Sequence, residues 1–202
     1  ELSVSTAYTC ASIHALEDAT VSDTTPESDA PMKLGSLIQQ AQALDVQAWV
    51  DQTATFFLVG PPPSDQRGDL SYFTSNVASV AVPETSLVVD ADYVVFPLHK
   101  ERNRPFGHLM LIGRSTSNDV QILDTSISKL HCKLTLRPTL SISDAGSRNG
   151  TSVDGIPLDP DVPMAVRDGS ILQLGNRVFA LFDAAHLHAV LLQLGKVMRA
   201  SL

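Results

Sequence analysis

The chain has 202 residues, enough for one or two domains with a buried core, and 44% of them are hydrophobic, a fraction typical of ordinary soluble proteins. No uninterrupted apolar run approaches eighteen residues, so the sequence predicts no membrane-spanning helix. The net charge of −8 divides into −11 on residues 1–93, +1 on 94–183 and +2 beyond, which leaves no basic stripe for the repeated phosphates of a nucleic acid.

The cysteine and histidine content argues against a disulfide framework and against a metal site. Cys10 and Cys132 lie far apart in different kinds of segment, which indicates a reducing compartment, and we expect a cytoplasmic protein. Neither cysteine has histidine or cysteine neighbours at ligand spacing. His186 and His188 stand two residues apart on a predicted helix, so they point to different faces and do not form a metal pair. We expect neither a metal nor a cofactor.

Residues 1–31 form an acidic N-terminal tail rich in serine, threonine, aspartate and glutamate. The run ATVSDTTPESDAP has no large apolar residue after Val21, so it cannot bury enough surface to offset chain entropy, and we predict disorder. Thr20, Thr24 and Thr25 stand in this acid-rich run, as kinase acceptor sites often do. The alternative is a plain solvated tail.

Residues 32–92 are predicted to form a small α+β extension. Apolar residues at helical spacing from Leu34 to Trp49 predict one amphipathic helix that ends at about Val50. A segment TFFLVG, three prolines and two stretches of apolar alternation follow, at residues 55–60, 61–63, 72–82 and 86–89. The alternations are typical of strands. This part of the sequence shows no nucleophile–base pair and no metal constellation, so we predict no enzyme activity.

From Tyr93 the pattern changes to short strands with turn signals every eight to twelve residues, which is typical of an antiparallel β-sandwich. The candidate strands are YVVFPL, HLMLIGR, VQIL, CKLTLR, LSISD, SILQLG and RVFALF. Residues 93–183 therefore form the predicted sandwich domain, and the predicted fold class is mainly β. A final helix is predicted from about Ala184 to Arg199, within a C-terminal segment of residues 184–202.

Three polar segments suit the binding of a single phosphate group. They are Gly113–Ser115, Ser128–His131 and Ser147–Thr151. Arg114 carries a planar fork of donors that fits two phosphate oxygens, and the Ser128 hydroxyl can donate to the same group. The amide of Asn149 both donates and accepts, so it can pair with a peptide backbone whatever the neighbouring side chain.

Each of these residues also has an ordinary structural interpretation. Arg114 can be a surface arginine, Ser128 a turn or cap residue, and Lys129 a solvated cation. Asn149-Gly150 is the strongest short hairpin signal, so the asparagine can shape a type I′ turn and bind a ligand at once.

The motifs resemble those of the forkhead-associated (FHA) domain, a β-sandwich that binds phosphothreonine peptides. The matching runs lie within residues 111–182 and are GRSTSNDV, SISKLH, DAGSRNGTSVDG, and RDGSILQLG followed by an aromatic residue near Phe179. The longer sequence is also similar to bacterial proteins with a single FHA module behind an α+β extension. The resemblance implies an adaptor module in Ser/Thr kinase signalling rather than an enzyme.

The resemblance also implies roles for individual residues. The implied phosphopeptide-binding residues are Arg114, Ser128, Lys129, Ser147, Arg148 and Asn149. The implied support of the site comprises Gly113, His131, Gly150 and Thr151. Arg114 would bind the phosphate and Asn149 the peptide backbone, while His131 would brace the loops. No orienting acid completes a triad around His131, so no catalytic residue is predicted.

The expected partner is a threonine-phosphorylated protein, such as a Ser/Thr kinase or its substrate, and neither nucleic acid nor a membrane. A few charge-assisted bonds of about 1.5–3 kcal/mol each must offset the ordering of a flexible peptide, so we expect micromolar affinity, about −8 kcal/mol. A phosphorylated Thr20, Thr24 or Thr25 could occupy the chain's own site and block outside partners. The alternative function is a phosphorylation-independent interaction scaffold.

Overall fold

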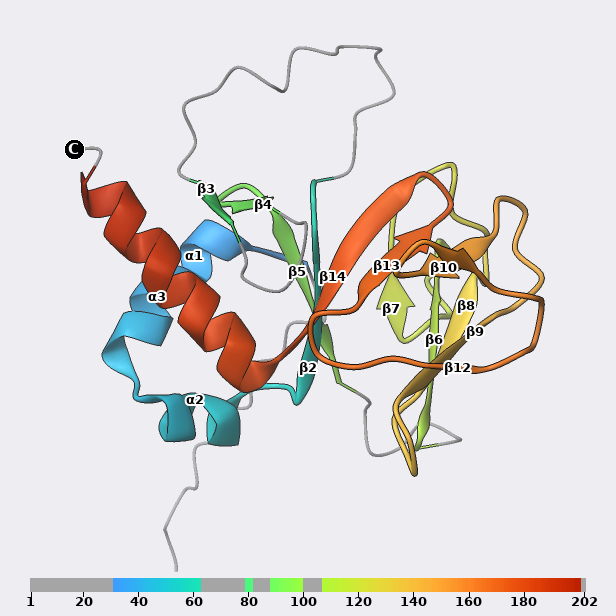
Figure 1. Cartoon of the computed structure of the whole chain (residues 1–202), viewed down its shortest axis with the longest axis horizontal. Helices are drawn as coiled ribbons and strands as arrows, with labels where there is room; N and C mark the ends of the chain where they lie inside the picture. Colours follow the sequence, from blue (N-terminus) through green and yellow to red (C-terminus); the bar gives the residue numbers. More distant parts are fainter. Residues whose placement is uncertain (1–30, 63–78, 82–87, 100–106, 201–202) are drawn as a thin grey trace, which may run out of the picture.

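A computed structural model of the chain describes residues 31–62, 79–81, 88–99 and 107–200. These residues form three layers (Figure 1), in which helices cover one face of a seven-stranded sheet and a five-stranded sheet packs on the other face. A short hairpin of β3 (Ser79–Ala81) and β4 (Val88–Asp90) lies beside the helices. The fold is mainly β, as predicted.

The seven-stranded sheet is antiparallel and runs in the order β1–β5–β2–β14–β13–β10–β11. Its strands are β1 (Met32–Lys33), β2 (Phe56–Gly60), β5 (Val94–Leu98), β10 (Thr151–Val153), β11 (Ile156–Pro157), β13 (Ile171–Leu174) and β14 (Arg177–Asp183). Leu58 of β2 lies opposite Phe96 of β5 on one side and Leu181 of β14 on the other. The sheet thus joins strands from both sides of the predicted boundary between residues 92 and 93, and that boundary stays a prediction.

The five-stranded sheet runs in the order β12–β9–β8–β6–β7. Its strands are β6 (Leu109–Gly113), β7 (Val120–Gln121), β8 (Cys132–Thr135), β9 (Ser141–Asp144) and β12 (Met164–Ala165). Neighbouring strands are antiparallel except β6 and β7, which are parallel, so the loop between them must cross over. All seven candidate strands of the sandwich are present. The sequence did not predict β1, β10, β11 and β12, because strands of two or three residues carry no readable alternation.

The central strands of the larger sheet are buried on both faces. Along β14, Phe179 and Leu181 belong to the core between the two sheets, whereas Ala180 and Phe182 belong to the core under the helices. Successive side chains of a strand point to opposite faces, so a strand covered on both sides has a continuous apolar sequence. The runs FFLV and FALF are therefore a consequence of the three-layer packing.

The helical layer comprises α1 (Leu34–Ala43), α2 (Val46–Gln52) and α3 (Ala184–Ala200). The prediction of α3 is confirmed, but the prediction of one continuous helix to about Val50 is wrong. The chain leaves the helical conformation at Leu44, and the carboxylate of Asp45 then accepts a hydrogen bond of 2.8 Å from the N–H of Ala48. Aspartate is a preferred residue at this capping position, so Asp45 begins a new helix.

His188 of α3 satisfies the open end of α1. Its Nε2 lies 2.9 Å from the carbonyl oxygen of Ala41 and 3.1 Å from that of Leu44. Carbonyls at the end of a helix lack partners within the helix, so a donor from a neighbouring element can stabilise the break. This contact between elements distant in sequence could not be predicted from helical periodicity.

Several predictions fall outside the described residues. These are the disorder of the N-terminal tail, its three threonines at positions 20, 24 and 25, and most of the strand expected at 72–82, of which residues 79–81 form β3. The strand expected at 86–89 is described only from residue 88, where β4 begins. Across the described ranges, none of the helices has both the length and the apolar composition needed to cross a membrane.

Candidate functional site

The first two polar segments meet at one end of the five-stranded sheet. Strand β6 ends where β8 begins, because Ile112 pairs with Cys132. Beyond this pair the backbone N–H of Arg114 donates to the carbonyl of Ser128 at 2.9 Å, and that of Ser115 donates to the carbonyl of Lys129 at 3.1 Å. The sheet register therefore brings the arginine and the serine of the two motifs together.

Gly113 allows this close approach of two backbones. A side-chain carbon at position 113 would lie 2.5 Å from the carbonyl oxygen of Lys129 and 2.9 Å from that of Ser128. These are backbone atoms of a neighbouring loop, so they cannot move away by a change of rotamer as the end of a flexible side chain can. The glycine predicted as support for the site is thus required by the packing of the loops.

Asn118 holds the same two loops together and was not identified from the sequence. Its side chain is buried, and its Nδ2 donates to the carbonyls of Ser115 at 2.9 Å and Lys129 at 2.6 Å. Asn118 lies inside the run GRSTSNDV, but from the sequence an asparagine before a strand is interpreted as an ordinary turn residue. The role of Asn118 becomes visible only in the structure, where its side chain lies next to the carbonyl of Lys129.

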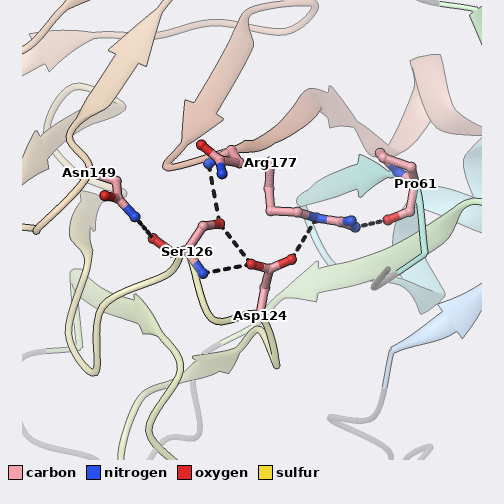
Figure 2. A network of polar contacts seen from close by, with 6 residues as sticks. Pro61, Asp124, Ser126, Asn149 and Arg177 are labelled. Carbon is pink, nitrogen blue, oxygen red and sulfur yellow. Dashed lines mark hydrogen bonds and ion pairs between the residues drawn. The ribbon is translucent and has the colours of Figure 1, made fainter. Parts of the chain in front are cut away.

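The third segment lies across the second. The backbone N–H of Arg148 donates to the hydroxyl oxygen of Ser128 at 3.0 Å. The side-chain Nδ2 of Asn149 donates to the carbonyl of Ser126 at 2.8 Å (Figure 2). These two hydrogen bonds attach the segment at 147–150 to the loop before β8, and the three polar segments form one surface.

The side chain of His131 connects the loop at Ser128 to the loop at Gly150. It is fully buried, its Nδ1 accepts from the N–H of Ser128 at 3.1 Å, and its Nε2 lies 3.1 Å from the carbonyl oxygen of Gly150. Since a carbonyl only accepts, Nε2 carries the hydrogen and the imidazole is neutral. Burial lowers the pKa of His131, against the opposing effects of the Gly150 carbonyl and Asp144. Its role in binding stays a prediction.

A buried carboxylate, that of Asp144, shapes the third segment. The residue opens the run DAGSRNGTSVDG, but the sequence did not identify it as part of the site. It accepts from the N–H of Ser147 at 2.8 Å, from the Ser147 hydroxyl at 2.6 Å and from the Thr151 hydroxyl at 2.6 Å. Burial raises the pKa of Asp144, but the bonds from Ser147 and Thr151 outweigh this, and the pKa lies below its usual value. The only hydroxyl hydrogen of Ser147 is thus donated within the protein.

Three cationic side chains are exposed around this surface, those of Arg114, Lys129 and Arg148. Nε of Arg114 donates to the carbonyl of Ile127 at 3.2 Å, which orients the guanidinium. Within the described part of the chain, no acceptor bonds the two terminal nitrogens of Arg114 or the hydroxyl hydrogen of Ser128. These donors and positive charges can together bind a multiply charged anion.

The described residues contain no group of three or more histidine, cysteine, aspartate or glutamate side chains arranged to hold a metal ion. His186 contacts Asp168 at 2.7 Å and His188 contacts α1, so the two histidines have separate partners. Cys132 is buried in the core between the sheets, and burial raises the pKa of its thiol. The groups of this surface that can contact a ligand are therefore the exposed cations and the Ser128 hydroxyl.

Residues 110–175 of the chain match the FHA domain family. A curated relative, mouse (Mus musculus) proliferation marker protein Ki-67, is 34% identical over 77 residues, which are 38% of this chain and 2% of the relative's length. Solved structures with similarity include the FHA domain of an Arabidopsis thaliana hypothetical protein (23% identity, TM-score 0.38, 65% of this chain and 86% of that one). Another is the FHA domain of the CT664 protein from Chlamydia trachomatis (18% identity, TM-score 0.36, 63% and 97%).

Proposed function

We propose that the surface formed by the three polar segments binds a phosphothreonine peptide, and that the chain acts as an adaptor in Ser/Thr kinase signalling. The observation that carries the proposal is the convergence of Arg114, Ser128 and Asn149 on one surface of an FHA domain, through hydrogen bonds between their loops. The expected partner is a threonine-phosphorylated protein, either a kinase or a kinase substrate.

In this proposal the phosphate lies between the guanidinium of Arg114 and the hydroxyl of Ser128. The terminal nitrogens of Arg114 donate to two phosphate oxygens, as the planar fork favours. Lys129 and Arg148 add positive charge from the rim, where their side chains are exposed. A phosphothreonine carries about −1.5 to −2 charges near pH 7 and three acceptor oxygens, so it is preferred to an aspartate or glutamate at the same place.

Asn149 binds the peptide backbone next to the phosphothreonine. Its Nδ2 is held by the carbonyl of Ser126, which leaves the amide oxygen and one N–H for a ligand. Ser147 contributes chiefly by shaping the loop, because its hydroxyl hydrogen is donated to Asp144. Contacts with the peptide backbone allow many peptide sequences to bind. Phosphorylation therefore controls whether a peptide binds, and contacts with neighbouring side chains determine which sequences are preferred.

The test is an oriented phosphothreonine-peptide library screened against the wild type and Arg114→Ala. We expect micromolar binding by the wild type and a loss of about tenfold or more in Arg114→Ala, since hydrogen bonds to charged groups contribute about 1.5–3 kcal/mol. Arg137→Ala is the matched control, because Arg137 is an exposed arginine that follows β8 at the end opposite Gly113. Partner binding that survives Arg114→Ala and dephosphorylation would instead select a phosphorylation-independent scaffold.

Regulation by the chain's own tail is part of the proposal. Thr20, Thr24 and Thr25 lie in an acidic run, and a phosphorylated threonine there would compete for the Arg114 surface. Phosphorylated chain with residues 1–31 should bind phosphopeptide more weakly than phosphorylated chain without them. Equal affinities would exclude autoregulation while leaving the binding function intact.

The proposed setting is the cytoplasm, in a bacterial type of protein with one FHA module and an α+β extension. The thiol of Cys132 is free and buried, which is compatible with a reducing compartment. Fractionation of cells that express the chain, followed by immunoblotting, tests the location directly.

A further inference from the structure

The amide of Asn149 has its orientation set by the loop before β8. Its Nδ2 donates to the carbonyl of Ser126 at 2.8 Å (Figure 2). An amide group is planar, so fixing the nitrogen also fixes the direction in which its oxygen points. A displacement of the Ser126 carbonyl would therefore turn the amide oxygen away from a bound peptide backbone.

Ser126 is itself held by three neighbouring groups. Its N–H and its hydroxyl donate to the same carboxylate oxygen of Asp124 at 2.8 and 2.7 Å, and its hydroxyl accepts from the N–H of Asn176 at 3.2 Å. Gly175 also lies against it: with φ of +58°, a side-chain carbon there would be 2.6 Å from the Ser126 carbonyl oxygen. Ser126 thus stands where three loops meet, and its position depends on Asp124.

The other carboxylate oxygen of Asp124 faces a buried arginine. It lies 3.7 Å from Nε of Arg177, and the two side chains are only 11% and 8% exposed. Nη2 of Arg177 donates to the carbonyl of Pro61, immediately beyond strand β2 (Figure 2). The contact between Asp124 and Arg177 is an ion pair without a hydrogen bond, because Nε of Arg177 has no hydrogen-bond partner among the described residues. Removing one member of a buried pair leaves an uncompensated charge, so each side chain stabilises the other in its buried place.

We propose that Asp124 and Arg177 are positioning residues for Asn149, and that they connect the ligand-binding loop to the end of β2. The inference rests on the proposed function, because it assumes that Asn149 binds a peptide backbone. Pro61 and Arg177 both lie outside residues 110–175, which match the FHA family. The binding unit of this chain therefore extends beyond the matched segment, into the sheet shared with the helical layer.

Two mild substitutions separate this role from simple stabilisation of the fold. Asp124→Asn removes the charge that faces Arg177, and Ser126→Ala removes the hydroxyl that joins Asp124 to Asn176 but keeps the carbonyl that contacts Asn149. We expect each to weaken binding of a phosphothreonine peptide by about three- to tenfold, the effect of one hydrogen bond. Affinity for the free amino acid O-phosphothreonine should change less than twofold, because the phosphate contacts are intact.

Matched controls lie in the turn between β4 and β5 and in the first turn of α1. Asp92→Asn removes the charge of an exposed ion pair with Lys33, whose Nζ lies 3.3 Å away. Ser36→Ala deletes a hydroxyl hydrogen bond of 2.6 Å to the carbonyl of Lys33. Both controls should leave peptide affinity at the wild-type value. A loss in the controls equal to that in Asp124→Asn and Ser126→Ala would overturn the proposal.

A double-mutant comparison tests whether Asp124 acts through Asn149. In the Asn149→Ala background, Asp124→Asn should cause no further loss of peptide affinity, since the side chain that it positions is absent. A further loss as large as in the wild-type background would mean that Asp124 acts elsewhere, and the proposal would fail.

The NMR signals of the Asn149 side-chain amide give a measurement that needs no ligand. They are identified by their disappearance in Asn149→Ala, and we expect them to shift in both Asp124→Asn and Ser126→Ala below the temperature of unfolding. Unchanged signals in Ser126→Ala would refute the positioning role, even if Asp124→Asn failed to fold. Shifted signals together with no phosphopeptide binding by the wild type would refute only the proposed function.

Discussion

Replacing Gly113 by alanine tests the idea that close packing of two backbones builds the site. A Cβ at this position would lie 2.5 Å from the carbonyl oxygen of Lys129 and 2.9 Å from that of Ser128. Both distances are far below ordinary van der Waals contact. The loops at 113–115 and 128–131 must therefore separate in Gly113→Ala.

The expected loss of stability follows from two contributions. Overpacking of a tight site costs about 1–3 kcal/mol. Separation of the loops also weakens the hydrogen bonds from Arg114 and Ser115 to the Ser128 and Lys129 carbonyls, and one lost bond costs about 1 kcal/mol. We expect Gly113→Ala to lower the free energy of unfolding by about 2–4 kcal/mol and the Tm by roughly 5–15 °C.

Thermal and urea unfolding measure these changes, and a phosphothreonine-peptide titration measures the accompanying loss of binding. Gly107→Ala is the matched control, because a side-chain carbon at Gly107 would meet no atom of the described residues within 4 Å. Alanine at such a position restricts the unfolded chain, so Gly107→Ala should be as stable as the wild type or more so. Equal Tm values for Gly113→Ala and Gly107→Ala would refute the packing argument.

Three further predictions concern stability. Burial lowers the pKa of His131, so the unfolded chain binds a proton more readily than the folded chain does. The free energy of unfolding should therefore decrease as the pH falls below about 6.5, and urea unfolding between pH 8 and 5 should show a smaller decrease in His131→Asn than in the wild type. Asp144→Ala removes the acceptor of three hydrogen bonds and should lower that free energy by about 3 kcal/mol, whereas the exposed-site variant Asp159→Ala should not. Asp45→Ala removes the cap of α2 and should cost about 1 kcal/mol in thermal unfolding; no change would argue that the helix break has another origin.

Local chemistry made much of the sandwich predictable. Strands β5 to β9, β13 and β14 follow from apolar runs and from turn signals between them, because a chain that must form buried strands with exposed turns repeats these two features. Arg114, Ser128 and Asn149 could be identified from side-chain chemistry, because their functional groups suit the binding of a phosphate or a peptide backbone in any fold.

Residues whose role depends on distant partners could not be found in this way. Asn118, Asp144 and Arg177 are polar side chains in or beside turns, which is where exposed polar residues usually occur. In the structure they are buried and bonded to other loops. A buried polar group requires a partner, but the identity of that partner depends on which segments the sheets bring together.

Most of the strands, the final helix and the groups proposed to bind a phosphopeptide could all be identified from the sequence. These properties depend on neighbouring residues and on side-chain chemistry, both of which can be read along the chain. Three features became visible only in the tertiary structure: β2 pairs with β5 and β14, His188 contacts the carbonyls of Ala41 and Leu44 where α1 ends, and Asn149 is oriented through Ser126. These features arise from contacts between segments far apart in sequence, whose proximity is set by packing on both faces of one sheet.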